Sequence, residues 1–121
     1  MDHLVLTIDD SRTMRDMLRM TLTGAGFRVV QANDGAHGLE VLESEKPDLV
    51  VTDINMPVMD GFGFIENARK LPAHRATPIL VLTTEADAKK KARAREAGAT
   101  GWIVKPFSPT KLVEVLRKVA P

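Results

Sequence analysis

The sequence contains no cysteine among its 121 residues. Disulfide bonds, thiolate metal sites and catalytic thiols are therefore excluded. It also lacks any apolar run near the roughly 18 residues of a membrane-spanning helix, and its first residues lack the pattern of a secretion signal. We expect a cytoplasmic protein without a membrane partner.

An excess of charge of one sign is missing as well: 17 Lys and Arg balance 16 Asp and Glu, for a net charge of +1. This balance gives no general reason to expect nucleic acid as a partner. The content of 44% hydrophobic and 27% charged residues is that of an ordinary globular protein. The length predicts a single domain over residues 1–121, with no attached output domain.

Short apolar runs alternate with segments in which apolar residues recur at helical spacing. The predicted strands are 3–8, 28–32, 49–53, 79–82 and 101–104. The predicted helices are 12–24, 35–46, 62–71, 87–97 and 109–120. Such alternation predicts right-handed crossovers and a parallel sheet covered by helices on both faces.

Two further local expectations concern surfaces. In the predicted helix 12–24, Leu18 and Leu22 lie on the inner face, Arg15 faces solvent, and Met17 and Met20 pack in the core or at its rim. The segment 72–78 is polar and bounded by prolines, which predicts a linker.

Polar side chains stand at the ends of four predicted strands. Asp9 and Asp10 follow the first strand, Asp53 the third, Thr83 the fourth and Lys105 the fifth. The carboxyl ends of parallel strands share one edge, where open α/β folds bind ligands, so we expect these side chains to converge. Taken singly, each has a plainer explanation, because aspartate favours turns and threonine favours strands.

Convergence of Asp9, Asp10 and Asp53 would have chemical consequences. Two carboxylates about 4 Å apart repel by about 4 kcal/mol at an effective dielectric near 20, so the cluster requires a cation. Oxygen ligands without imidazole or thiol favour Mg²⁺. One carboxylate would then act as a nucleophile toward a phosphoryl group, whose oxygens Mg²⁺, Lys105 and Thr83 would stabilise.

Four blocks in this order resemble the signature of bacterial two-component response-regulator receiver domains. The blocks are Ile8-Asp9-Asp10-Ser11, the stretch from Asp53 to Gly61 with Met56-Pro57, Leu82-Thr83-Thr84, and Val104-Lys105-Pro106-Phe107. Within that family the chain is most similar to the stand-alone, CheY-like chemotaxis regulators. The resemblance implies a flavodoxin-like fold: a doubly wound, five-stranded parallel sheet of order 2-1-3-4-5 with five helices.

The resemblance also assigns roles to the site residues. It implies that Asp53 is the phosphoacceptor and that Lys105, followed by a cis peptide bond, contacts the phosphoryl group. Mg²⁺ would be bound by Asp10 directly, by Asp9 largely through water, by Asp53, and by the backbone carbonyl of Asn55.

The resemblance also assigns four residues to the control of signalling. Thr83 and Trp102 would form the switch, with tryptophan standing where the family usually has tyrosine or phenylalanine. Asn55 and Glu85 occupy the variable positions that tune hydrolysis in this family, and their combination predicts a short-lived acyl phosphate.

The predicted helix 87–97 is strongly basic, through Lys89, Lys90, Lys91, Arg93 and Arg95. Such a run is either a solvated helix face or the docking site of an acidic partner. In the second case Lys91, Arg95 and Trp102 are the candidate contacts.

The function that the resemblance implies is a signalling switch that catalyses its own phosphorylation and dephosphorylation without being an enzyme in the usual sense. A CheA-like histidine kinase would donate the phosphoryl group to a monomer, whose target would be a flagellar motor switch protein or another protein. A phosphate sink or relay intermediate is the alternative. A different class is a small Mg²⁺-dependent phosphatase, which would need an aspartate where this chain has Asn55.

Overall fold

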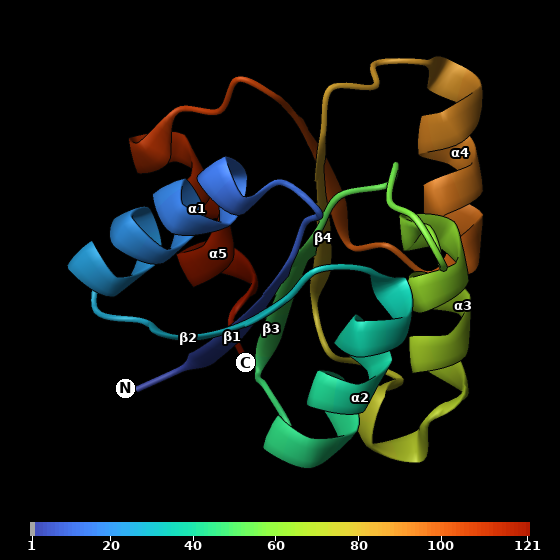
Figure 1. Ribbon diagram of the computed structural model, residues 1–121, viewed down its shortest axis with the longest axis horizontal. Helices are drawn as coiled ribbons and strands as arrows, with labels where there is room; N and C mark the ends of the chain where they lie inside the picture. Colours follow the sequence, from blue (N-terminus) through green and yellow to red (C-terminus); the bar gives the residue numbers. More distant parts are fainter. Residues whose placement is uncertain (1) are drawn as a thin grey trace.

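A computed structural model describes residues 2–121 and shows a five-stranded parallel sheet between two layers of helices (Figure 1). The strands are β1 (Leu4–Ile8), β2 (Arg28–Ala32), β3 (Leu49–Thr52), β4 (Ile79–Thr83) and β5 (Gly101–Val104). The helices are α1 (Arg12–Gly24), α2 (Gly35–Glu45), α3 (Gly61–Lys70), α4 (Ala88–Ala97) and α5 (Pro109–Val119), with a 3₁₀ turn, η1 (Pro72–His74). The strand order is β2-β1-β3-β4-β5, which confirms the predicted flavodoxin-like fold. Within residues 2–121, no helix combines the length and the apolar content needed to cross a membrane.

The core lies on both faces of the sheet. Helices α1 and α5 cover one face, and α2, α3 and α4 cover the other (Figure 1). Val5 of β1 belongs to the cluster under α1 and α5, whereas its neighbour Leu6 belongs to the cluster on the opposite face. Because successive strand residues point to opposite faces, a strand covered on both sides is expected to be mostly apolar. Strands β1, β3 and β4 accordingly bury every residue.

Each α-helix begins at a side chain that caps it. Each cap accepts a hydrogen bond from a backbone N–H of the first turn; the caps are Ser11, Asp34, Asp60, Asp87 and Ser108. Such caps replace hydrogen bonds that the first turn of a helix lacks. The start of α3 is also fixed by Gly61, because a Cβ there would collide with the carbonyl oxygen of Asp53. Helix α3 can therefore begin directly against the end of β3.

The segment 72–78 is more ordered than the predicted linker. Pro72–His74 forms η1, and His74 is buried, with Nδ1 2.9 Å from Thr77 Oγ1. The Arg69 side chain donates hydrogen bonds to the carbonyls of His74 (2.8 Å), Thr77 (2.6 Å) and Gly98 (2.7 and 3.0 Å). One arginine thus ties α3 to the approach to β4 and to the end of α4.

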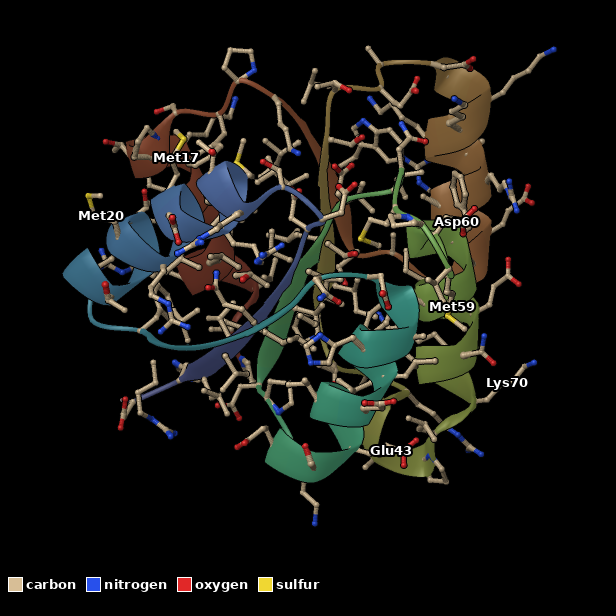
Figure 2. All side chains as sticks on the ribbon, in the orientation of Figure 1. Met17, Met20, Glu43, Met59, Asp60 and Lys70 are labelled. Atoms are coloured by element: carbon tan, nitrogen blue, oxygen red, sulfur yellow. The ribbon has the colours of Figure 1, made fainter. Side chains whose placement is uncertain are left out.

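The expectation that Met17 and Met20 pack in the core or at its rim is wrong. The exposed fractions of Met17 and Met20 are 48% and 73%, and Figure 2 shows Met20 pointing away from the body of the protein. Leu18 and Leu22, one turn apart, already form the buried face of α1. Met17 and Met20 fall outside that face.

Candidate functional site

The three predicted carboxylates meet at the carboxyl edge of the sheet. Ile8 and Thr52 are paired in the register of β1 and β3, so Asp9 and Asp53 leave the sheet side by side. The N–H of Asp53 continues the pairing by donating to the carbonyl of Ile8 at 2.9 Å. Asp9, Asp10 and Asp53 each contribute an oxygen within 4.8 Å of the others. The expected convergence is therefore present.

Lys105 lies between two of these carboxylates. Its Nζ is 2.9 Å from Asp9 Oδ2 and 3.0 Å from Asp53 Oδ2, and its side chain is only 11% exposed. The N–H of Lys105 donates to the Thr83 carbonyl at 2.7 Å, which extends the pairing of β4 and β5 to the site. The Lys105–Pro106 peptide bond is cis, as the resemblance implies.

The second oxygens of Asp9 and Asp53 are held by backbone donors. Asp9 Oδ1 accepts from the N–H of Ser11 at 2.9 Å, and Asp53 Oδ1 accepts from the N–H of Ile54 at 2.6 Å. Both carboxylates are therefore oriented by a fixed backbone group on one oxygen and by a lysine on the other. Asp10, in contrast, is exposed.

Burial and charge oppose one another at this site. Burial raises the pKa of Asp9 above its ordinary value, and hydrogen bonds from Lys105 and Ser11 offset only part of that rise. Burial lowers the pKa of Lys105, but its hydrogen bonds to Asp9 and Asp53 and their charges outweigh this, so the pKa is raised. The cluster thus holds three carboxylates and one ammonium group, which contacts two of them. A donor set made only of oxygens, with surplus negative charge, fits a hard divalent cation such as Mg²⁺.

Thr83 and Trp102 are connected through the backbone of Glu85. Thr83 is fully buried at the end of β4, and its Oγ1 lies 3.4 Å from the N–H of Glu85. The carbonyl of Glu85 accepts a hydrogen bond from the indole N–H of Trp102 at 3.0 Å. The loop after β4 therefore links the acidic site to a half-buried tryptophan on the edge strand.

Comparison with known proteins identifies the family. The family model of the response regulator receiver domain matches residues 5–117. The chain belongs to this family. As a receiver domain, it is a component of two-component signalling. Its fold closely matches the chemotaxis response regulator CheY4 of Vibrio cholerae, with 42% identity and a TM-score of 0.93 over 98% of this chain and 99% of that one. A putative response regulator from Chloroflexus aurantiacus is 34% identical, with a TM-score of 0.93 over 98% of both chains.

Curated relatives of the receiver are longer proteins. A probable transcriptional regulator, ycf27, of Porphyridium aerugineum is 38% identical over 95% of this chain, which spans 47% of that protein. The sensor histidine kinase CheAY of Helicobacter pylori is 35% identical over 97% of this chain, which spans 15% of that protein. The receiver therefore spans about half of the length of ycf27 and a much smaller part of the length of CheAY.

Two contacts of the receiver site were not predicted. Asn55 Nδ2 lies 3.0 Å from Glu85 Oε1, and Lys90 Nζ of α4 lies 3.1 Å from the same oxygen. The hydrogen bonds from Asn55 and Lys90, together with the charge of Lys90, lower the pKa of Glu85. Asn55 and Glu85 were predicted site residues, but a run of adjacent lysines does not indicate which one would pair.

Arg15 makes a third contact that was not predicted, and the expectation that it faces solvent is wrong. Its guanidinium donates to the carbonyl of Asp9 at 2.7 Å, and the backbone carbonyl of Arg15 accepts a hydrogen bond from Gln31 Nε2 at 2.7 Å. Arg15 therefore holds the backbone at Asp9, where β1 ends and the acidic cluster begins. The sequence feature that could have indicated this contact is the position of Arg15 in the first turns of the helix that follows Asp9.

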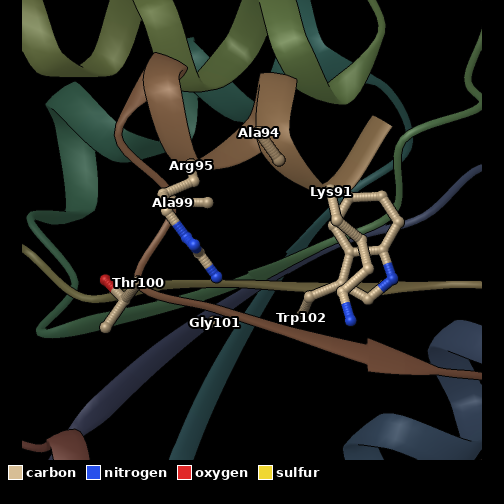
Figure 3. Close-up of a pocket in the computed structure, with 7 residues that line it drawn as sticks. All are labelled: Lys91, Ala94, Arg95, Ala99, Thr100, Gly101 and Trp102. Carbon is tan, nitrogen blue, oxygen red and sulfur yellow. The ribbon is translucent and has the colours of Figure 1, made fainter. Parts of the chain in front are cut away.

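The predicted partner residues lie together on the receiver surface. Lys91, Arg95 and Trp102 line a small pocket of about 60 Å³ between α4 and β5 (Figure 3). Its other lining residues are Ala94, Ala99, Thr100 and Gly101. The pocket therefore combines small apolar side chains with two cations at its rim.

Proposed function

We propose that this receiver is a phosphorylation-activated switch. A histidine kinase donates a phosphoryl group to Asp53 in a reaction that requires Mg²⁺, and the modified receiver changes its affinity for a protein target. The observation that carries the proposal is Lys105, whose ammonium group bridges the buried carboxylates of Asp9 and Asp53. This arrangement holds a cationic group at the oxygen where a phosphoryl group would be received.

The geometry distinguishes the two oxygens of Asp53. Oδ1 is held by the N–H of Ile54, whereas Oδ2 contacts the side chain of Lys105, so we assign Oδ2 as the attacking oxygen. This oxygen forms a bond to phosphorus while the bond from phosphorus to the donor nitrogen breaks, and that electron pair leaves with the donor. Lys105 then stabilises the oxygens of the transferred group.

Asp9, Asp10, Asp53 and the backbone carbonyl of Asn55 are the groups that would hold Mg²⁺. When bound, the ion supplies positive charge that neutralises the phosphoryl oxygens and the carboxylates together. The exposed Asp10 leaves the cluster open on one side. Thr83 and Trp102 would report phosphorylation to the surface of α4 and β5, through the Glu85 backbone that contacts both.

The pathway we favour is chemotaxis in the cytoplasm. Similarity to CheY4 and to the kinase CheAY supports a CheA-like kinase as donor and a flagellar motor switch protein, or another protein, as target of a monomeric receiver. The chain also matches a segment of CheAY, which is named a sensor histidine kinase and not an output protein, and this favours the second candidate, a phosphate sink or relay intermediate. A small phosphatase is not supported, because the family is that of receivers and an amide stands at Asn55.

Acetyl phosphate and Mg²⁺ are expected to add one phosphoryl group to the receiver. Intact-protein mass spectrometry measures the adduct, and EDTA in place of Mg²⁺ is expected to prevent it. Hydroxylamine should remove the group, because it cleaves acyl phosphates and leaves phosphoesters intact. The adduct should also decay quickly once the donor is removed. A folded receiver that gains no mass would contradict the proposal.

Charge reversal at the α4 pocket is expected to weaken target binding. We propose an acidic target, so Lys91→Glu combined with Arg95→Glu should lower the affinity of the phosphorylated receiver at least about tenfold, since like charges then face each other. Titration of a flagellar motor switch protein measures this affinity. Lys70→Glu at the end of α3 (Figure 2), combined with Arg75→Glu, reverses two exposed charges outside the pocket and is the control for net charge. Equal affinity of the double variant and the control would argue against this surface.

A further inference from the structure

Lys90 belongs to a bridge that lies beside the acceptor site and outside the signature blocks. Its Nζ is 3.1 Å from Glu85 Oε1, with the two side chains 40% and 30% exposed. The same oxygen accepts from Asn55 Nδ2 at 3.0 Å. Asn55 is two residues beyond Asp53, and Glu85 is two residues beyond Thr83. The bridge therefore joins the loops that follow β3 and β4, at the edge of the sheet where Asp53 lies.

The carboxylate of Glu85 is fixed from two sides. Asn55 approaches from the loop that carries the acceptor, and Lys90 approaches from the first turn of α4. The backbone of Glu85 is held as well, by Thr83 and by Trp102. With the ion pair in place, Oε1 has two donors, so the carboxylate is held against Asn55 and is not free to turn toward a water molecule beside Asp53.

Hydrolysis of the acyl phosphate depends on a water molecule at this edge. The water oxygen forms a bond to phosphorus, the bond from phosphorus to the Asp53 oxygen breaks, and its electron pair remains on the carboxylate. The proton released by the water leaves with the inorganic phosphate or enters solvent. A free carboxylate nearby would accept a hydrogen bond from that water and orient it for attack.

We propose that Lys90 is a positioning residue that lengthens the life of the acyl phosphate by holding Glu85 against Asn55, across the loops beside Asp53. The inference rests on the proposed function and deepens it, because it adds a determinant of signal duration specific to this ion pair. Lys90 acts through Glu85 and does not itself contact the reacting atoms.

Lys90→Met is expected to accelerate loss of the phosphoryl group by about two- to fivefold, the range that suits an exposed ion pair. The decay is followed by intact mass after removal of acetyl phosphate. Lys90→Arg preserves the cation and should restore the wild-type lifetime. Lys89→Met removes an equal charge from the adjacent, exposed position and should leave the lifetime unchanged.

The effect must also depend on Glu85. In a Glu85→Gln background, which lacks the carboxylate charge, adding Lys90→Met should change the decay by less than a factor of about 1.5, within the usual limit of additivity. Any of three results would overturn this inference while the proposed function stands. The first is an equal lifetime in wild type and Lys90→Met. The second is an effect of Lys89→Met as large as that of Lys90→Met, and the third is a full effect of Lys90→Met in the Glu85→Gln background. Absence of an adduct on the wild type would overturn both.

Discussion

Asp53→Asn is expected to abolish the phosphoryl adduct that acetyl phosphate and Mg²⁺ form on the receiver. The amide has nearly the same shape, and its oxygen can still accept the hydrogen bond from Ile54. It is, however, far less nucleophilic than a carboxylate and places a neutral amide nitrogen where Asp53 Oδ2 now meets Lys105. Lys105 keeps Asp9 as a partner, so the fold should persist. Intact mass and circular dichroism of the same sample measure both properties.

Asp60→Asn is the matched control for this result. Asp60 lies in the same loop and caps α3 by accepting a hydrogen bond from the N–H of Gly63 at 2.8 Å. Asparagine caps helices about as well as aspartate, so this variant should retain the full adduct. An adduct on Asp53→Asn would identify another acceptor. Its loss from Asp60→Asn as well would mean that the loop, rather than the Asp53 nucleophile, had been tested.

The sequence was sufficient to predict that Asp9, Asp53 and Lys105 converge, because their positions follow from the ends of the strands. Apolar runs placed Asp9 and Asp53 immediately beyond β1 and β3, and the parallel register then brings them side by side. Lys105 follows from the same rule applied to β5. The backbone position of a residue directly beyond a regular strand is set by the sheet topology, so the sequence predicts which of these residues lie side by side.

Long side chains on helices and in loops were harder to predict. Arg15 was expected in solvent but donates to the carbonyl of Asp9, and Lys90 pairs with Glu85 across a loop. Backbone carbonyls are present at every residue, so the sequence does not mark which ones an arginine will reach. The same limit explains the ordered structure in 72–78, where the partner is Arg69 on the preceding helix.

Arg69→Ala is expected to lower the free energy of unfolding by about 3 kcal/mol. Removal of the guanidinium leaves the carbonyls of His74, Thr77 and Gly98 without their donor, at a cost of about 1 kcal/mol each where water can partly replace it. For a domain of this size the midpoint of thermal unfolding should fall by about 10 °C. Urea unfolding followed by circular dichroism measures the free energy.

Two further variants separate the hydrogen bonds of Arg69 from its charge. Lys70→Ala removes a cation from the adjacent, exposed position and should change stability by less than about 0.5 kcal/mol. Arg69→Lys keeps the charge, but one ammonium lacks the planar fork that reaches three carbonyls, so it should recover less than half of the loss. Full recovery by lysine would show that charge is what matters. Stability of Arg69→Ala equal to that of Lys70→Ala would mean that the junction of α3, η1 and α4 is held by packing alone.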